Sequence, residues 1–341
     1  MTLKEVKEKA KGKMGYCVSC DVCDGRECKN LMPGPGAKGS GRVSIDNYEA
    51  WKKIHLNIDT INDDSEIDTS IELFGNKFSL PVFAAPIGNV RMHYGKLYKE
   101  EVYFEKLVSC CKNAGICAWT GDSADESTMK TATDVIKNND GIGIPTIKPW
   151  EVDIVNKKIE LVKNSNAFAF AMDVDSLSLR TFNIDELKVK SYSVYDLNTI
   201  SKSIDKPFII KGIMTVNGAK KAIDAGAKGI VVSNHGGRSF DEVPATADVL
   251  KEIADFAKGK CKIFVDGGIR NGMDVFKALA LGADAVLIGR PFTQMVYGDA
   301  DEGVGIYVKE LERELKEAML MCGAKKISDI NYNMVRVTNY D

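Results

Sequence analysis

Residues 229–245 read Gly-Ile-Val-Val-Ser-Asn-His-Gly-Gly-Arg-Ser-Phe-Asp-Glu-Val-Pro-Ala, and this stretch decides the kind of fold to expect. The apolar run 229–232 is typical of a short buried strand. Two glycines then allow a sharp turn that holds His235 and Arg238. A candidate base and an anion-binding side chain therefore lie at the carboxyl end of a strand, where β/α barrels place their chemistry. An ordinary turn with a structural histidine is the alternative, because so short a motif also occurs by chance.

The same alternation of strand and helix extends over most of the chain. Short apolar runs predict strands, and a helical pattern follows each of them. The predicted strands are residues 82–85, 116–119, 141–144, 167–172, 207–211, 229–233, 262–266 and 285–288, and the predicted helices are 99–114, 125–138, 150–164, 195–204, 215–225, 245–258, 272–281 and 303–321. Eight such units favour an α/β fold built as a closed (β/α)8 TIM barrel. An open doubly wound sheet is the alternative, but no Gly-x-Gly-x-x-Gly follows the first strand.

Length and composition suit one such barrel with an extension. The chain has 341 residues, of which 44% are hydrophobic, and a barrel of roughly 250 residues leaves room for additions. Residues 1–45 form a predicted Cys-rich N-terminal extension, and residues 46–341 a predicted barrel domain. The formal net charge of -2 argues against a nucleic-acid partner. The sequence has no signal-peptide or membrane-spanning pattern, so we expect a cytoplasmic protein without a membrane partner, and we expect a homo-oligomer.

Two glycine–arginine loops follow the last two predicted strands. Residues 266–272 read Asp-Gly-Gly-Ile-Arg-Asn-Gly, and residues 288–291 read Ile-Gly-Arg-Pro. Barrels often bind phosphate with the loops after strands seven and eight, where glycine lets backbone N–H groups approach the ligand. Arg270 and Arg290 would add charge-assisted hydrogen bonds. Tight turns with solvated arginines are the alternative, but two such loops in adjacent late positions favour a phosphate site.

Two further polar residues follow or end predicted strands. Lys211 closes the fifth strand, directly after two isoleucines, and Asp173 follows the fourth. A lysine at the end of an apolar strand needs a partner if it is buried, and a cofactor can supply one. Asp173 is a candidate to orient His235 and stabilise its charged form, as the third member of a base assembly does.

Taken together, these motifs resemble the FMN-dependent α-hydroxy-acid oxidases and dehydrogenases, a family that includes glycolate oxidase and lactate oxidase. The similarity spans about residues 70–300 and is strongest over 233–247 and 265–291. It implies that the chain binds FMN and oxidises a small 2-hydroxy acid to the 2-oxo acid, either as an oxidase or as a dehydrogenase.

The resemblance also assigns roles to individual residues. His235 is similar to the family's catalytic base, Asp173 to its supporting aspartate, and Arg238 and Arg180 to the two active-site arginines that bind the substrate carboxylate. Lys211 matches the lysine beside the flavin N1 and C2 carbonyl. The implied FMN contacts are Ala85, Pro86, Lys211, Ser233, Asp266, Gly267, Gly268, Arg270, Gly289 and Arg290.

The substrate side of the site departs from the family pattern. Residues 145–148 read Pro-Thr-Ile-Lys where the family has Gln-x-Tyr, so the tyrosine that binds the substrate is missing. The segment between Asp173 and Lys211 is much shorter than the mobile lid of the family. We therefore expect a rebuilt substrate pocket, and neither glycolate nor L-lactate follows from the sequence.

Other functions share parts of this pattern. Inosine monophosphate dehydrogenase has the same phosphate loops but uses a cysteine after the sixth strand, where this chain has Asn234 and His235. An FMN-dependent isopentenyl diphosphate isomerase-like enzyme is a second alternative, although its family lacks a His-Gly-Gly-Arg base assembly. A flavin-binding electron-transfer or sensing module is a third, although it does not account for both His235 and Arg238.

The N-terminal extension holds a separate motif. Cys17, Cys20, Cys23 and Cys28 have the spacing C-x2-C-x2-C-x4-C, which resembles a bacterial ferredoxin run with one extra residue in the last gap. Four thiolates at this spacing predict a zinc ion or an iron–sulfur cluster. Reduced thiols in a flexible extension are the alternative, since the chain has nine cysteines and no export signal.

Overall fold

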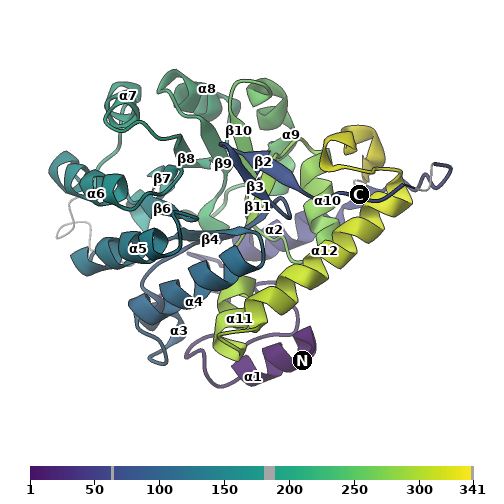
Figure 1. Ribbon diagram of the computed structural model, residues 1–341, viewed down its shortest axis with the longest axis horizontal. Helices are drawn as coiled ribbons and strands as arrows, with labels where there is room; N and C mark the ends of the chain where they lie inside the picture. The colour runs from purple at the N-terminus through teal and green to yellow at the C-terminus, as the bar shows by residue number, and fades with distance from the viewer. Residues whose placement is uncertain (63–64, 180–188, 339–341) are drawn as a thin grey trace.

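Eight parallel strands close into a barrel in the computed structural model of the protein, which describes residues 1–62, 65–179 and 189–338 (Figure 1). In chain order the strands are β4 (Val82–Ile87), β5 (Cys117–Thr120), β6 (Ile144–Ile147), β7 (Phe170–Asp173), β8 (Phe208–Ile213), β9 (Gly229–Val232), β10 (Lys262–Val265) and β11 (Ala285–Ile288). The barrel closes where β11 pairs with β4, with Val286 opposite Val82. The predicted TIM barrel is therefore confirmed.

The strands form where the sequence is apolar and β-branched, and their side chains are buried on both faces as parallel strands require. The third strand is the largest departure from prediction, because β6 begins at Ile144 instead of residue 141. Asp140 and Gly141 have φ values of 59° and 75°, so this stretch ends the preceding helix in a left-handed turn. The strand begins only after that turn.

Helices surround the barrel (Figure 1). The eight that were predicted are α4 (Glu100–Asn113), α5 (Glu126–Asn138), α6 (Val152–Asn164), α7 (Val194–Lys202), α8 (Val216–Asp224), α9 (Thr246–Ala257), α10 (Gly272–Ala280) and α12 (Gly303–Cys322). An additional helix, α11 (Arg290–Gly298), lies between β11 and α12. Its residues from Pro291 onward are buried, so it lacks the polar face that marks a surface helix. Across the described ranges, every helix is too short or too polar to cross a bilayer.

A hairpin covers the amino-terminal end of the barrel. Strands β2 (Ile71–Leu73) and β3 (Asn76–Phe78) pair antiparallel, and Phe74 and Gly75, both with positive φ, form the turn between them. The Phe78 ring packs edge-on against Phe83 of β4, with 4.9 Å between the ring centroids. The hairpin thus seals the end of the barrel opposite to the one where polar residues follow the strands.

The first 40 residues pack on the barrel. Helix α1 (Leu3–Ala10) contacts α11 and α12, and the Lys38 N–H donates to the Gly237 carbonyl at 2.8 Å. Helix α2 (Arg42–Lys52) follows, so the proposed boundary between residues 45 and 46 falls inside a helix. The division into extension and barrel domain stays a prediction. Two short strands, β1 (Ile54–Leu56) and β12 (Val335–Val337), pair antiparallel with each other.

Candidate active site

A pocket opens at the carboxyl ends of the barrel strands. Its empty space is about 1200 Å³ including the open mouth, which is ample for a nucleotide-sized cofactor beside a small substrate. The predicted residues that line it are Ala85, Pro86, Asp173, Lys211, His235, Arg238, Asp266, Gly267, Gly268, Arg270, Gly289 and Arg290. These predicted residues therefore lie together around one pocket. Predicted Arg180 lies outside the described residues.

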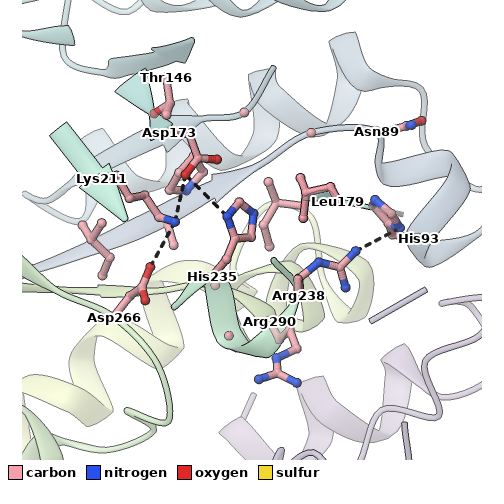
Figure 2. Close-up of a pocket in the computed structure, with 18 of the residues that line it drawn as sticks. Asn89, His93, Thr146, Asp173, Leu179, Lys211, His235, Arg238, Asp266 and Arg290 are labelled. Atoms are coloured by element: carbon pink, nitrogen blue, oxygen red, sulfur yellow. Dashed lines mark hydrogen bonds and ion pairs between the residues drawn. The ribbon is translucent and has the colours of Figure 1, made fainter. Parts of the chain in front are cut away.

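A buried charge cluster forms the floor of the pocket (Figure 2). Asp173 pairs in register with Lys211 on the neighbouring strand, and its Oδ1 lies 3.1 Å from the Lys211 Nζ. Asp266, after β10, places Oδ2 3.6 Å from the same Nζ and accepts a hydrogen bond from the Ser233 hydroxyl at 2.9 Å. Burial alone would lower the pKa of Lys211, but the three carboxylates of Asp173, Asp175 and Asp266 raise it above its ordinary value. Lys211 is therefore a fixed positive charge.

His235 stands above this floor in a strained turn. It follows β9 and has a φ of 58°, and its N–H donates to the Ser233 hydroxyl at 3.0 Å. Its Nδ1 lies 3.2 Å from Asp175 Oδ1 and 3.5 Å from Asp173 Oδ1. Burial alone would raise the pKa of Asp173, but His235, Lys211 and Lys148 hold it well below its ordinary value. Two carboxylates therefore orient one ring nitrogen, and the nearer one, Asp175, was missed in the sequence.

Arg238 forms the side wall together with the N-terminal segment. Its Nη1 donates to the carbonyls of Gly34 at 2.7 Å and Gly36 at 2.8 Å. Its Nη2 points at His93 Nδ1, 3.5 Å away, and this nitrogen also accepts the Gly34 N–H (Figure 2). Burial, reinforced by the Arg238 charge, lowers the pKa of His93 to about 3. His93 is therefore a neutral acceptor that holds the guanidinium of Arg238. The only sequence signal for it was that the chain has just three histidines.

Lys148 is the last residue of the stretch 145–148, which departs from the family pattern. Its backbone follows β6, and its Nζ lies 3.3 Å from Asp173 Oδ2. Buried Asp122 holds this segment, because it accepts the Lys148 N–H at 3.2 Å, the Trp150 indole N–H at 2.6 Å and the Lys158 ammonium at 2.7 Å. A second cation thus lines the same pocket as Arg238, and it is positioned by a hydrogen-bond network that the sequence did not reveal.

The glycines of the two predicted phosphate loops differ in what they contact. A Cβ atom on Gly268 would stand 1.9 Å from the Asn47 carbonyl, and one on Gly267 would stand 2.9 Å from the Thr246 hydroxyl. These two glycines are therefore required by packing against α2 and α9. A Cβ on Gly289 would meet only Ile87 and Ala85 at ordinary contact distances, so this glycine borders open space. Ser233 is buried beneath the pocket and supports His235 and Asp266.

The polar groups that remain unpaired fit FMN. Among buried side-chain atoms, Arg270 Nη2, Asp266 Oδ1 and Thr146 Oγ1 have no hydrogen-bond partner within the described structure, and all three residues line the pocket. Arg270 and Arg290 offer positive charge at the end where β10 and β11 finish, and Thr146 offers a hydroxyl across the mouth. A ligand with an anionic phosphate at one end and a polar ring at the other satisfies both.

Of the four predicted metal ligands, Cys23 and Cys28 contact Arg270 and Arg290 at the edge of this site. Within the described parts of the chain, the one group of three or more potential ligand atoms within 4.8 Å of one another is Asp173, Asp175 and His235. No three of the four cysteine thiols, each in a described residue, lie that close together, so the predicted zinc ion or iron–sulfur cluster stays a prediction.

One pH-dependent contact positions His93. Glu100 accepts the Val90 N–H at the start of helix α3 (Val90–Tyr94), which carries His93. Burial raises the pKa of Glu100 to about 7, from an ordinary value near 4.5. A carboxyl whose pKa is raised by folding stabilises the protein below pH 4.5, and this contribution is lost as the pH rises to 7.

We expect the substitution Glu100→Gln to remove this pH dependence. Because the amide still accepts the N–H but never ionises, the free energy of unfolding of the variant relative to the unchanged protein should rise by about 1–2 kcal/mol between pH 5 and pH 8, allowing for partial exposure. Urea unfolding at the two pH values measures this. Glu101→Gln on the same helix is the control, since Glu101 is exposed. Equal pH profiles for the two variants would contradict the assignment.

Comparisons with known proteins agree with this geometry. The model of the FMN-dependent dehydrogenase family matches residues 35–186 and 178–337. A peroxisomal (S)-2-hydroxyacid oxidase of Arabidopsis thaliana is 30% identical over 331 residues, which cover 86% of this chain and 88% of the relative. The 4-hydroxymandelate oxidase of Amycolatopsis orientalis is 27% identical over 341 residues, which cover 89% and 94%.

Solved structures share the fold. A mandelate oxidase with (S)-4-hydroxymandelic acid has a TM-score of 0.81 and 22% identity, and the match covers 99% of both chains. A mandelate oxidase mutant with the C4a-OH-FMN adduct has a TM-score of 0.74 and 25% identity over 89% of this chain and 94% of the other. A flavocytochrome b2 mutant with sulfite bound has a TM-score of 0.81 and 22% identity over 99% and 86%.

Proposed function

Because the chain belongs to the FMN-dependent α-hydroxy-acid dehydrogenase family, we propose that it oxidises a small 2-hydroxy acid to the 2-oxo acid, with His235 as the base. The observation that carries the proposal is the convergence of His235, Arg238 and Lys211 on one pocket at the mouth of the barrel. A base, a carboxylate binder and a fixed cation are the three groups that this reaction asks of the protein.

His235 would take a proton from the substrate. Its Nδ1 faces the carboxylates of Asp175 and Asp173, so Nδ1 carries the hydrogen and Nε2 has the free lone pair. The imidazolium that forms is stabilised by the same two carboxylates. Asp173 stays ionised throughout, because its low pKa keeps its negative charge beside the ring.

Two cations would hold the substrate carboxylate. Backbone carbonyls fix Nη1 of Arg238, which leaves Nη2 on the side of His93 and the pocket. Lys148 faces the pocket from β6 and gives a single charge-assisted bond. This pair of cations supports a substrate whose acid group is held by charge on two sides.

Arg270, Arg290 and Lys211 would hold FMN. The two arginines suit the phosphate, and the orphaned Arg270 Nη2 has a donor ready for it. Lys211 suits the ring edge that becomes negative on reduction, because it remains charged between Asp173 and Asp266. When bound, FMN supplies the acceptor for the two electrons that leave the substrate.

Anaerobic titration of the flavin-loaded protein tests the proposal. Addition of aliphatic and aromatic 2-hydroxy acids should bleach the flavin absorbance with at least one of them. The corresponding acids without the hydroxyl should leave it unchanged, since they lack the C2 hydroxyl that the reaction converts to a carbonyl. Bleaching by dithionite but by none of the 2-hydroxy acids would contradict the proposal.

The substitution Lys148→Met tests the substrate-binding cation. Loss of one charge-assisted bond costs about 1.5–3 kcal/mol, so KM should rise about tenfold or more. The FMN content should stay the same, because Lys148 lies away from the arginines of the phosphate loops. Lys157→Met on α6 is the control, since Lys157 is exposed. An unchanged KM in steady-state assays would exclude Lys148 from substrate binding.

A further inference from the structure

The cysteine-rich segment is bound to the barrel end that carries the phosphate loops. Arg270 Nε donates to the Cys23 carbonyl at 2.6 Å, and Gln294 Nε2 of α11 donates to the Cys20 carbonyl at 3.2 Å. Arg290 Nη1 lies 4.0 Å from the Cys28 thiol. Three of the four cysteines are thus tied to groups that follow β10 and β11, and the segment is no flexible arm.

All four cysteines are free thiols of intermediate exposure, and they lie within one segment of twelve residues. Because the contacts of Cys20, Cys23 and Cys28 all go to groups that follow β10 and β11, this short segment holds its thiols at one end of the barrel. Four thiolates in so short a segment repel one another unless a cation joins them.

The thiols, as the structure places them, stand further apart than the ligands of a single tetrahedral ion. Tetrahedral zinc with Zn–S bonds of about 2.3 Å brings its sulfurs to about 3.8 Å from one another. No three of these thiols, all within the described residues, lie within 4.8 Å of one another. In an iron–sulfur cluster the thiolates bind different irons, and their sulfurs stand further apart.

We propose that Cys17, Cys20, Cys23 and Cys28 bind an iron–sulfur cluster beside the phosphate end of the pocket. Each thiol loses its proton to water as its S–Fe bond forms, and the assembled cluster is transferred from a carrier, whose own bonds to the irons break. Arg270 and Arg290 offset the negative charge of a thiolate-bound cluster.

This site goes beyond the oxidation proposed above, because neither the base nor the carboxylate binders take part in it. The chemistry of the ligand set, four thiolates without histidine or carboxylate, selects soft iron–sulfur centres over hard cations. The cluster would give the protein a one-electron centre within the same fold that is built to hold a two-electron cofactor.

Iron and acid-labile sulfide analysis of the full chain tests the proposal. The protein is purified without oxygen and, in a second sample, reconstituted with ferrous iron and sulfide. We expect equal amounts of iron and sulfide, about two or more of each per chain, and an electron paramagnetic resonance signal after dithionite reduction. Zinc at about one equivalent, or iron and sulfide below one per chain after reconstitution, would overturn it.

Matched cysteine variants locate the cluster. Cys23→Ser and Cys20→Ser should each lose most of the iron and the resonance signal, whereas Cys261→Ser, far from the quartet in sequence, should keep both. Flavin released by acid is measured in the same samples, so failure to bind FMN is distinguished from failure to bind iron. Retention of iron in both quartet variants, or equal loss in the Cys261 variant, would also overturn the proposal.

Discussion

Replacing His235 with asparagine is expected to slow flavin reduction by a 2-hydroxy acid by about 10²–10⁴-fold, the usual contribution of a positioned general base. An amide cannot take up the substrate proton. Asparagine is the best choice of substitute because His235 has a φ of 58°, and asparagine tolerates the left-handed region better than most residues. FMN content should be unchanged, since the phosphate arginines are untouched.

Anaerobic stopped-flow absorbance measures this rate. His55→Asn is the control, because His55 is an exposed histidine on β1, remote from the barrel mouth. Reduction at the unchanged rate would remove His235 as the base and leave Asp175 or Lys148 to be considered.

Replacing Arg270 and Arg290 together with methionine is expected to weaken FMN binding about 10²–10⁴-fold. Each arginine gives one charge-assisted contact to an anion, worth about 1.5–3 kcal/mol, and a factor of ten corresponds to about 1.4 kcal/mol. The Arg270 Nη2 is buried and has no hydrogen-bond partner within the described part of the protein, so its donor is available to a ligand. Replacing Arg270 therefore removes a hydrogen bond to the ligand and breaks none made by this nitrogen within that part. Quenching of flavin fluorescence during titration gives the dissociation constants.

Arg313→Met is the matched control for this pair, because Arg313 lies on exposed α12 and pairs only with neighbouring glutamates among the described contacts. Circular dichroism checks that the double variant is folded. A dissociation constant within about threefold of the unchanged protein would show that the phosphate is held elsewhere, since the loss of even one contact exceeds this factor.

The barrel and its mouth could be predicted because their signals are local. Apolar runs, helical periodicity and the glycine–arginine loops each lie within about ten residues of sequence, and the strand ends then bring Lys211, His235 and Arg290 to one face. The closure of the barrel by β4 and β11 follows from the count of strands alone.

The remainder of the site depends on contacts between distant segments. Asp175 is found only because a 3₁₀ turn after β7 bends its side chain back toward His235, and Asp173 seemed sufficient for that role in the sequence. His93 matters only because Gly34 and Arg238 meet it, and neither is near it in sequence. Gly268 was predicted only as part of the phosphate loop. Its packing against Asn47 of α2 could not be predicted, because the sequence does not show where α2 lies on the barrel.

The seating of the N-terminal segment also has a consequence for biosynthesis. Residues 1–40 leave the ribosome well before their partners Arg238, Arg270, Arg290 and Gln294 are made. At roughly 5–20 residues per second, the segment waits roughly 10–50 s before its docking surface exists. A nascent chain that stalls before α11 therefore lacks part of the surface that binds the cysteine segment, so translation must pass α11 before this segment can dock fully.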